Sequence, residues 1–328
     1  MILASLKQGG RDGTLVVVDS TRTRLRPVPQ IAATLQAALD CWSEAAPELQ
    51  AACADLNREP AQNSEPLDPA ALACPLPRSY QFLDGSVYLH HMEKARRARG
   101  ADMPPNYRTE PLMYQGVSDG FCAPGEPMRL PSEDLEIDYE AEIAVVLDDV
   151  PLGISAAAAG KHVKLLLLMN DYTARALTRS EIPKGFGFVQ AKPTSSFAPF
   201  AVSPDELPGW DGTRLSARVE TRVNGKLLGA PDAGTDMFFT YPQLIAHAAR
   251  TRRLCAGTII AAGAISNQDP TLGHGCIAEA RTDEQTSIGT AQTPWLRFGD
   301  QIRIEAFDSA GVSLFGAIEQ RIEQSPPA

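Results

Sequence analysis

Residues 138–147 read DYEAEIAVVL, a stretch that joins alternating carboxylates to an uninterrupted apolar end. Because successive side chains of a β-strand point to opposite faces, Asp138, Glu140 and Glu142 are expected to share one face of a strand. Like charges placed so closely repel one another unless a cation separates them, and hard divalent ions take such oxygen ligands. A solvated strand face, or a charged edge that prevents aggregation, has the same pattern. The stretch therefore predicts a strand and leaves a metal site and a solvated face as alternatives.

Further strand-like segments surround this one in the C-terminal part of the chain. They are separated by Gly, Pro, Asn and Asp, and they include LSARVETRVNG at 215–225, GTIIAAG at 257–263, QIRIEAF at 301–307 and SLFGAIEQ at 313–320. Alternating or apolar runs of four to eight residues between turn residues are typical of strands. We therefore expect an α+β chain that is mostly β.

The N-terminal residues form a different pattern. MILASLK and TLVVVD flank the turn signal QGGRDG, which predicts a β-hairpin. The apolar spacing from Ile31 to Trp42 predicts a helix, and a second short helix is expected after a break at Ala46-Pro47.

Residues 58–78 have the composition of a linker, because they hold five prolines. We therefore place a domain boundary there. The prediction is a small hairpin-plus-helices domain with a Pro-rich linker at 1–78 and a second, mostly β domain at 79–328.

The charge and composition exclude several classes of protein. The 328 residues carry 40 acidic against 30 basic side chains, a formal charge of −10, which argues against nucleic-acid or anionic-membrane partners. The longest dense apolar stretch, LLLLM at 165–169, is far shorter than the ~20 residues that span a bilayer. The opening MILASLKQGG lacks the features of a signal peptide, and the six cysteines form no CxxC pair. We expect a cytoplasmic protein with free thiols.

Three other segments carry side chains that suit chemistry. The apolar run in HVKLLLLMNDYTARALTRS ends abruptly at Asp171, where a buried strand would emerge, although a helix N-cap has the same local pattern. Asp84 and His91 lie seven residues apart in YQFLDGSVYLHHMEKARRARG, but most isolated histidines are surface or core residues. Lys192 lies in the loop GFGFVQAKPTSSFAPF, which matches neither phosphate-loop motif.

One motif match is rejected. Gly116-Val117-Ser118-Asp119-Gly120 satisfies GxSxG, but a nucleophile elbow needs a buried strand before the serine and a helix after it. The following FCAPGEP contains Pro and Gly, which prevent that helix. Ser118 is therefore not expected to be a nucleophile.

The combination of these motifs resembles the fumarylacetoacetate hydrolase family. The similar segments are DYEAEIAVV, NDYTAR at 170–175, GFVQAKPTSSFAP at 187–199, LMYQG at 112–116 and AAGAISNQDPTLGHGCIAEA at 261–280. The resemblance spans roughly residues 80–320. It implies a mixed β-roll or sandwich of the family's C-terminal type, preceded by a small N-terminal domain, and usually a homodimer.

The resemblance also implies roles for individual residues. Four carboxylates match the family's metal ligands: Asp84, Glu140, Glu142 and Asp171. His91 resembles the general base and Glu279 the group that orients it. Arg175, Lys192 and Tyr114 resemble the substrate-contacting residues, the first two with a catalytic role.

This sequence departs from the mammalian pattern at two positions. Thr178 stands where that pattern has a substrate-contacting glutamine, and Ala264 stands where it has a threonine. Both changes concern the substrate rather than the metal.

The implied activity is metal-dependent hydrolysis of a carbon–carbon bond in a small β-diketone dicarboxylic acid of the fumarylacetoacetate or acylpyruvate type, in the catabolism of aromatic compounds such as tyrosine. Mg²⁺ is the expected cofactor, with Ca²⁺ or Mn²⁺ as alternatives, and a small diketo or 2-oxo acid is the expected ligand. Two alternatives stay open. One is an oxaloacetate-type decarboxylase or hydratase on the same metal site, and the other is a non-catalytic β-rich binding protein stabilised by a metal.

Overall fold

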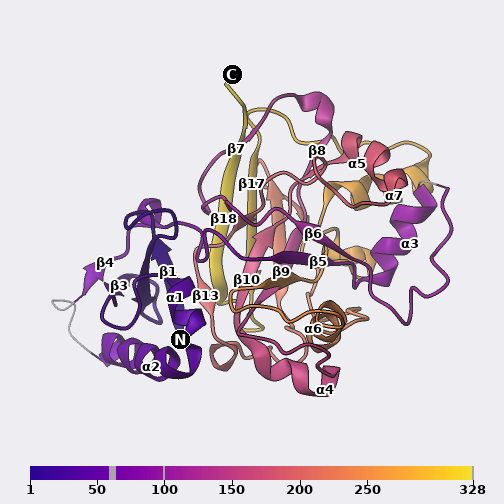
Figure 1. The fold of residues 1–328 in the computed structure, drawn as a ribbon. Helices are drawn as coiled ribbons and strands as arrows, with labels where there is room; N and C mark the ends of the chain where they lie inside the picture. Colours follow the sequence, from indigo (N-terminus) through magenta and orange to yellow (C-terminus); the bar gives the residue numbers. More distant parts are fainter. Residues whose placement is uncertain (59–63, 99, 327–328) are drawn as a thin grey trace.

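A mixed β-sheet forms the centre of the molecule (Figure 1). The computed structural model describes residues 1–58, 64–98 and 100–326. Within that part, the sheet has eleven strands, and ten of them follow the order β4-β3-β2-β1-β13-β10-β9-β16-β5-β6, with β12 paired to β10. Its strands are β1 (Ile2–Leu6), β2 (Thr14–Val18), β3 (Arg24–Pro27), β4 (Glu65–Pro66), β5 (Phe82–Gly85), β6 (Met113–Gly116), β9 (Ala141–Leu147), β10 (Val163–Asn170), β12 (Ser196–Phe197), β13 (Ala201–Val202) and β16 (Ile259–Ala261).

Two smaller sheets accompany the central one. The five-stranded sheet has the order β15-β14-β17-β18-β7, and a two-stranded sheet pairs β11 with β8. These strands are β7 (Met128–Leu130), β8 (Ile137–Asp138), β11 (Thr173–Ala174), β14 (Arg218–Val223), β15 (Lys226–Gly229), β17 (Gln301–Phe307) and β18 (Ser313–Gln324). The predicted α+β fold that is mostly β is confirmed.

Strand β9 is buried on both faces, which its apolar sequence explains. Ile143, Val145 and Leu147 join a core that includes residues of β14, β17 and β18. Ala144 and Val146 join a second core that includes residues of the N-terminal helices. The carboxylates at the start of this stretch are buried too, with Asp138 and Glu142 at 0% exposure and Glu140 at 5%. The solvated-face interpretation is therefore wrong, because all three carboxylates are buried.

The predicted single strand over 138–147 is interrupted. Asp138 ends β8, which pairs with β11, whereas β9 begins at Ala141 and pairs with β10. Glu140 lies between them and forms an isolated bridge to Cys276. The chain changes pairing partners here, so each carboxylate meets different neighbours.

The N-terminal hairpin is confirmed, and it extends the central sheet. Strand β1 pairs with β2 and also with β13, where Ile2 is opposite Val202. Helices α1 (Leu35–Asp40) and α2 (Trp42–Arg58) follow. The expected break at Ala46-Pro47 is wrong, since the helices separate at Cys41 and Pro47 lies inside α2. Pro47 removes only the bond to the carbonyl of Ser43, in the first turns of the helix and at an exposed residue that water can reach.

Three helices gather on the side of the sheet opposite the N-terminal hairpin (Figure 1): α3 (Leu89–Ala98), α5 (Arg175–Glu181) and α7 (Ile277–Ile288). Helices α4 (Ala156–Ala159) and α6 (Tyr241–Ala248) lie together at another end. None of the described helices combines the length and the apolar character needed to cross a membrane. All six cysteines are free thiols.

Candidate active site

Strand pairing brings three carboxylates from distant parts of the sequence together. Asp84 lies on β5 and Glu142 on β9, two strands that both pair with β16. The register of β9 and β10 places Ala141 opposite Asn170, so the chain leaves the sheet at Asp171 close to Glu142. One oxygen from each of Asp84, Glu142 and Asp171 lies within 4.8 Å of the others.

Two of these three carboxylates have a buried oxygen without a partner among the described residues, whereas Asp171 is bonded by neighbouring side chains. When both groups are ionised, Asp84 Oδ1 and Glu142 Oε1 have no hydrogen-bond donor among the described residues. Burial, reinforced by the neighbouring carboxylates, raises the pKa of both groups well above the usual range. Buried, unsatisfied and clustered oxygens of this kind are suitable ligands for a hard divalent cation. The residues present therefore fit a metal site.

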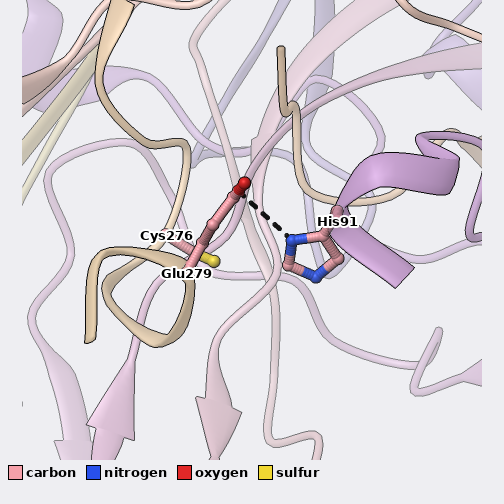
Figure 2. A group of neighbouring side chains, drawn as sticks. All are labelled: His91, Cys276 and Glu279. Carbon is pink, nitrogen blue, oxygen red and sulfur yellow. Dashed lines mark hydrogen bonds and ion pairs between the residues drawn. The ribbon is translucent and has the colours of Figure 1, made fainter. Parts of the chain in front are cut away.

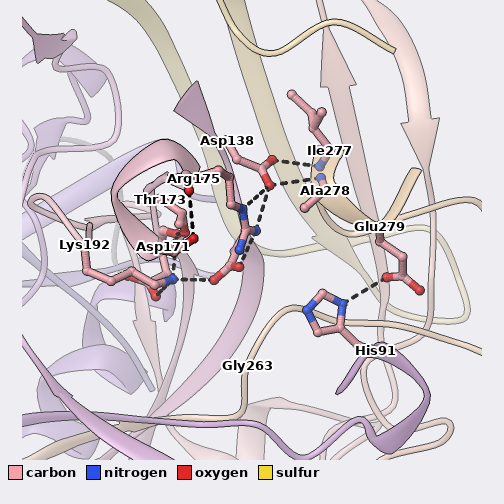
Figure 3. Close-up of polar contacts among 12 residues, drawn as sticks. His91, Asp138, Asp171, Thr173, Arg175, Lys192, Gly263, Ile277, Ala278 and Glu279 are labelled. Atoms are coloured by element: carbon pink, nitrogen blue, oxygen red, sulfur yellow. Dashed lines mark hydrogen bonds and ion pairs between the residues drawn. The ribbon is translucent and has the colours of Figure 1, made fainter. Parts of the chain in front are cut away.

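Glu140, the fourth predicted ligand, is paired with cations. Its Oε2 lies 2.5 Å from Lys192 Nζ, and its Oε1 accepts a bond of 2.6 Å from Arg175. Burial opposes ionisation of Glu140, but Lys192 and Arg175 outweigh it and lower its pKa to about 2. Lys192 also bonds Asp171 Oδ2 at 2.5 Å (Figure 3). Lys192 thereby joins Glu140 to the three-carboxylate cluster.

Asp171 is held by two further hydroxyl groups. Tyr114 donates to its Oδ2 at 2.5 Å, and Ser195 donates to its Oδ1 at 2.7 Å. The helix N-cap interpretation of Asp171 is wrong, because α5 begins at Arg175 and Ala174 is its N-cap. Sequence reasoning missed Ser195, although it lies three residues after Lys192 in a segment of small residues.

His91 and Glu279 meet across helices α3 and α7 (Figure 2). His91 Nδ1 lies 3.3 Å from Glu279 Oε2, while Glu279 Oε1 accepts bonds from Lys94 at 3.0 Å and Ser266 at 2.6 Å. Burial opposes ionisation of Glu279, but its bond to His91 and the other donors lower its pKa. Lys94 and Ser266 were missed by sequence reasoning. The signal for Lys94 is its position three residues after His91, which puts both side chains on one helical face.

The thiol of Cys276 lies next to this pair (Figure 2). Burial raises the pKa of Cys276 well above the usual range, so the thiol stays protonated near neutral pH.

One cavity joins the two groups of residues. It measures about 300 Å³, and its lining includes Asp84, His91, Tyr114, Glu140, Arg175 and Lys192. Thr178 and Ala264, the two departures from the mammalian pattern, also line it.

Comparison with known proteins identifies the family. A model described as "Fumarylacetoacetate (FAA) hydrolase C-terminal" matches residues 81–323, and one described as "Fumarylacetoacetase N-terminal domain 2" matches residues 1–78. The chain belongs to the fumarylacetoacetate hydrolase family. The resemblance inferred from the motifs is thereby confirmed.

Relatives within the family differ in activity. Oxaloacetate tautomerase YisK of Bacillus subtilis is 36% identical over 218 residues, which cover 66% of this chain and 62% of YisK. Among solved structures, a putative HpcE protein from Mycobacterium smegmatis matches with a TM-score of 0.70 and 20% identity, over 99% of this chain and 100% of that one. Maleylpyruvate hydrolase from Sphingobium sp. SYK-6, in complex with manganese(II) and pyruvate, matches with a TM-score of 0.65 and 16% identity, over 99% of this chain and 100% of that one. At these identities the two structures establish the fold alone.

Proposed function

We propose that this protein is a metal-dependent hydrolase that cleaves a carbon–carbon bond in a small β-diketone dicarboxylic acid of the fumarylacetoacetate or acylpyruvate type. The observation that carries the proposal is the cavity where a histidine–glutamate pair adjoins a cluster of unsatisfied buried carboxylates. Hydrolysis of such a bond needs a base to activate water and a means of stabilising the negative charge that then develops on the substrate. The two groups of residues divide these tasks.

Asp84, Glu142 and Asp171 would hold the ion, with Glu140 beside them. Mg²⁺ is the expected ion and Mn²⁺ or Ca²⁺ are alternatives; one structural neighbour contains manganese. The bound ion would supply Lewis-acid stabilisation of negative charge on substrate oxygens. Asp171 is already fixed by Ser195 and Tyr114, which limits its freedom to turn away.

His91 is the proposed general base. Because Nδ1 faces Glu279, its other ring nitrogen is free to face the cavity, and Figure 3 shows that nitrogen on the side of Arg175 and Lys192. That nitrogen takes a proton from water as the water oxygen bonds to a carbonyl carbon. The bond between this carbon and its neighbour then breaks, and its electron pair leaves with the enolate fragment. Ionised Glu279 stabilises the imidazolium that forms.

Arg175 and Lys192 are the proposed anion contacts of the substrate. Both line the cavity, and both stay cationic because buried carboxylates raise their pKa despite the opposing effect of burial. Preorganised donors in such a site are each worth about 3 kcal/mol towards a developing oxyanion.

A second candidate is keto–enol tautomerisation of oxaloacetate. The observation that favours it is the 36% identity to oxaloacetate tautomerase YisK. The same histidine would then move a proton between carbon and solvent without adding water to a carbonyl. The two candidates share the ion and the base, and they differ in whether a carbon–carbon bond breaks.

The test is a substrate panel with saturating Mg²⁺ or Mn²⁺. Fumarylacetoacetate, two acylpyruvates and oxaloacetate are followed by ultraviolet absorbance, and the products are identified by mass spectrometry. Hydrolysis predicts two carboxylic acids from a diketone. Loss of enol absorbance from oxaloacetate with no cleavage of any diketone would favour the tautomerase, and release of CO₂ would favour the decarboxylase. Metal binding without any turnover would favour the non-catalytic alternative.

We also propose the two-domain division at residue 78, a homodimeric state and a cytoplasmic location. The family models meet near that boundary, at residues 78 and 81. Expression of 79–328 alone and light scattering of the full chain test the first two. An insoluble fragment would contradict independent folding of the second domain, and a monomeric mass would contradict the dimer.

A further inference from the structure

Asp138 opens the carboxylate row at 138–142, but the proposed function gives it no task. It is fully buried, and it lies outside the three-carboxylate cluster and the cavity lining. Four donors nevertheless converge on its two oxygens (Figure 3). A buried carboxylate with so many partners holds those partners in place.

The first two donors belong to the start of α7. Asp138 Oδ1 accepts from the N–H of Ile277 at 2.8 Å, and Oδ2 accepts from the N–H of Ala278 at 3.0 Å. The first N–H groups of a helix have no acceptor within the helix, and the N-cap residue Cys276 makes no side-chain cap. Asp138 thus caps α7 from a strand that is far away in sequence. Glu279, the partner of His91, is the third residue of this helix.

The other two donors belong to Arg175. Its Nε and Nη2 reach Asp138 Oδ2 at 2.8 and 2.7 Å, and Nη2 also reaches Glu140 Oε1 at 2.6 Å. The guanidinium is held between two carboxylates, so its orientation in the cavity wall depends on both. One buried side chain therefore contacts the helix that carries Glu279 and the arginine that lines the cavity.

We propose that Asp138 is a positioning residue that sets the relative placement of Glu279 and Arg175. The proposal rests on the proposed function for its kinetic consequences, but its structural consequences are independent of any substrate. In Asp138→Asn an NH₂ group replaces one of the two carboxylate oxygens. In the place of Oδ1 it faces the N–H of Ile277, and in the place of Oδ2 it faces both the N–H of Ala278 and Arg175. In either orientation one N–H group of α7 loses its acceptor, and the two halves of the site shift relative to each other.

Hydrogen exchange of the wild-type protein gives a first test. The amides of Ile277 and Ala278 should be protected like helix-interior amides, because Asp138 accepts from them. Amides that exchange at the rate of an open helix end would overturn the proposal without any variant. This measurement also covers the case in which a variant at this position does not fold.

Asp138→Asn is the matched substitution, and Asp19→Asn is its control. Asp19 is also buried and also accepts two backbone N–H groups, from Thr23 and Arg24, and approaches an arginine, but it lies in the N-terminal hairpin region. Asp138→Asn should speed exchange at Ile277 or at Ala278, whichever N–H then faces the NH₂ group, by about tenfold or more, the effect of losing a hydrogen bond to a charged group. It should also move the ¹⁵N signal of the His91 ring, which is resolvable among five histidines. Asp19→Asn should change neither, and an unmoved His91 signal in Asp138→Asn would contradict the proposal.

Kinetics separate positioning from a general loss of stability. Asp138→Asn should lower kcat by about 10²-fold, the scale of a small misplacement of reacting groups. In a Glu279→Gln or Arg175→Gln background the same change should cost much less, because the positioned group is already gone. Equal losses in all backgrounds would mean that Asp138 acts only on the fold. If the wild-type protein turns over no substrate, the proposed function fails while the exchange and ¹⁵N results still decide the role of Asp138.

Discussion

The two halves of the candidate site differ in how completely their charges are paired. Around Glu279, every carboxylate oxygen has a donor, since His91, Lys94 and Ser266 all contact it. Around Glu142 and Asp84, buried oxygens of ionised carboxylates lack donors within the described chain. Helices α3 and α7 supply Glu279, His91 and Lys94, with Ser266 from the segment between β16 and α7, whereas the central sheet supplies Glu142 and Asp84.

This difference separates a finished ion-pair network from a site that needs a further component. Pairing lowers the pKa of Glu279, whereas burial and crowding raise the pKa of Glu142 and Asp84. The protein therefore stabilises one group as an anion by itself, and it disfavours the other unless a cation is added. The histidine–glutamate pair is therefore formed before any ligand binds, whereas the carboxylate cluster needs a bound cation to be stable as an anion.

Removal of divalent ions should have the largest effect. Treatment with EDTA should reduce turnover below detection and lower Tm, because the carboxylates repel one another without a cation, and added Mg²⁺ or Mn²⁺ should restore both. The measurement is turnover beside a thermal melt, with a metal-depleted buffer lacking EDTA as control. Full activity in excess EDTA, with no metal found by elemental analysis, would remove the metal from the mechanism.

Replacement of the base should have the next largest effect. His91→Ala should reduce turnover by about 10²- to 10⁴-fold, the usual contribution of a general base, while metal affinity stays near normal. His90→Ala is the matched control, because it lies beside His91 on α3 but does not line the cavity. Glu279→Gln should act in the same direction but less strongly, and the double variant should lose much less than the product of the single losses. Fully multiplicative losses would mean that the two residues are not coupled.

The pH dependence of stability should distinguish the two halves. Asp84 and Glu142 have higher pKa values in the folded protein than in the unfolded chain. Their neutral forms therefore contribute stability that is fully present below the pKa of the unfolded chain. This contribution is lost as pH rises through the pKa of the folded protein. Between pH 5 and 8, the free energy of unfolding of the metal-free protein should fall by up to about 1.4 kcal/mol per pH unit for each group that titrates there. Bound metal should flatten this slope, and Glu142→Gln should reduce it. If the free energy of unfolding of the metal-free protein changes with pH equally steeply in wild type and in Glu142→Gln, that result would argue against the cluster.

Ser118→Ala should have the smallest effect. Ser118 follows β6 in an irregular segment, and no helix begins there, so it lacks the setting of a nucleophile. We expect turnover within a few-fold of wild type in a steady-state assay. A loss of about 10³-fold or more, the scale of removing a true nucleophile, would overturn the assignment of the site.

The sequence predicted the strands well, because their apolar runs and alternation are local features. The run from Glu142 to Leu147 and the hairpin before Asp19 both form as expected. The predicted helix break at Pro47 was wrong, since the cost of a proline depends on its distance from the helix start, which composition does not give. The switch of pairing partners at Glu140 is also non-local, because it depends on β10 and β11.

The site was predictable in its residue types but not in its pairings. The motifs indicated Asp84, Glu142 and Asp171, which the fold brings together. They also grouped Glu140 with these ligands, whereas its oxygens contact Lys192 and Arg175; its role as a ligand stays a prediction. No local sequence pattern predicts that Lys192, 52 residues from Glu140, will contact it. Non-local folding likewise determines the hydrogen bonds made by Lys94, Ser195, Ser266 and Asp138.

Calorimetric titration of Mn²⁺ into the chelator-treated protein tests the central claim most directly. Wild type should bind one ion per chain, and His91→Ala should bind it with unchanged stoichiometry and similar affinity. Glu142→Gln should bind it more weakly by at least the roughly 10- to 100-fold that loss of an outer partner costs. Equal affinity in wild type and Glu142→Gln, or loss of the ion in His91→Ala, would contradict the division of the site into a carboxylate cluster that holds the ion and a separate histidine–glutamate base.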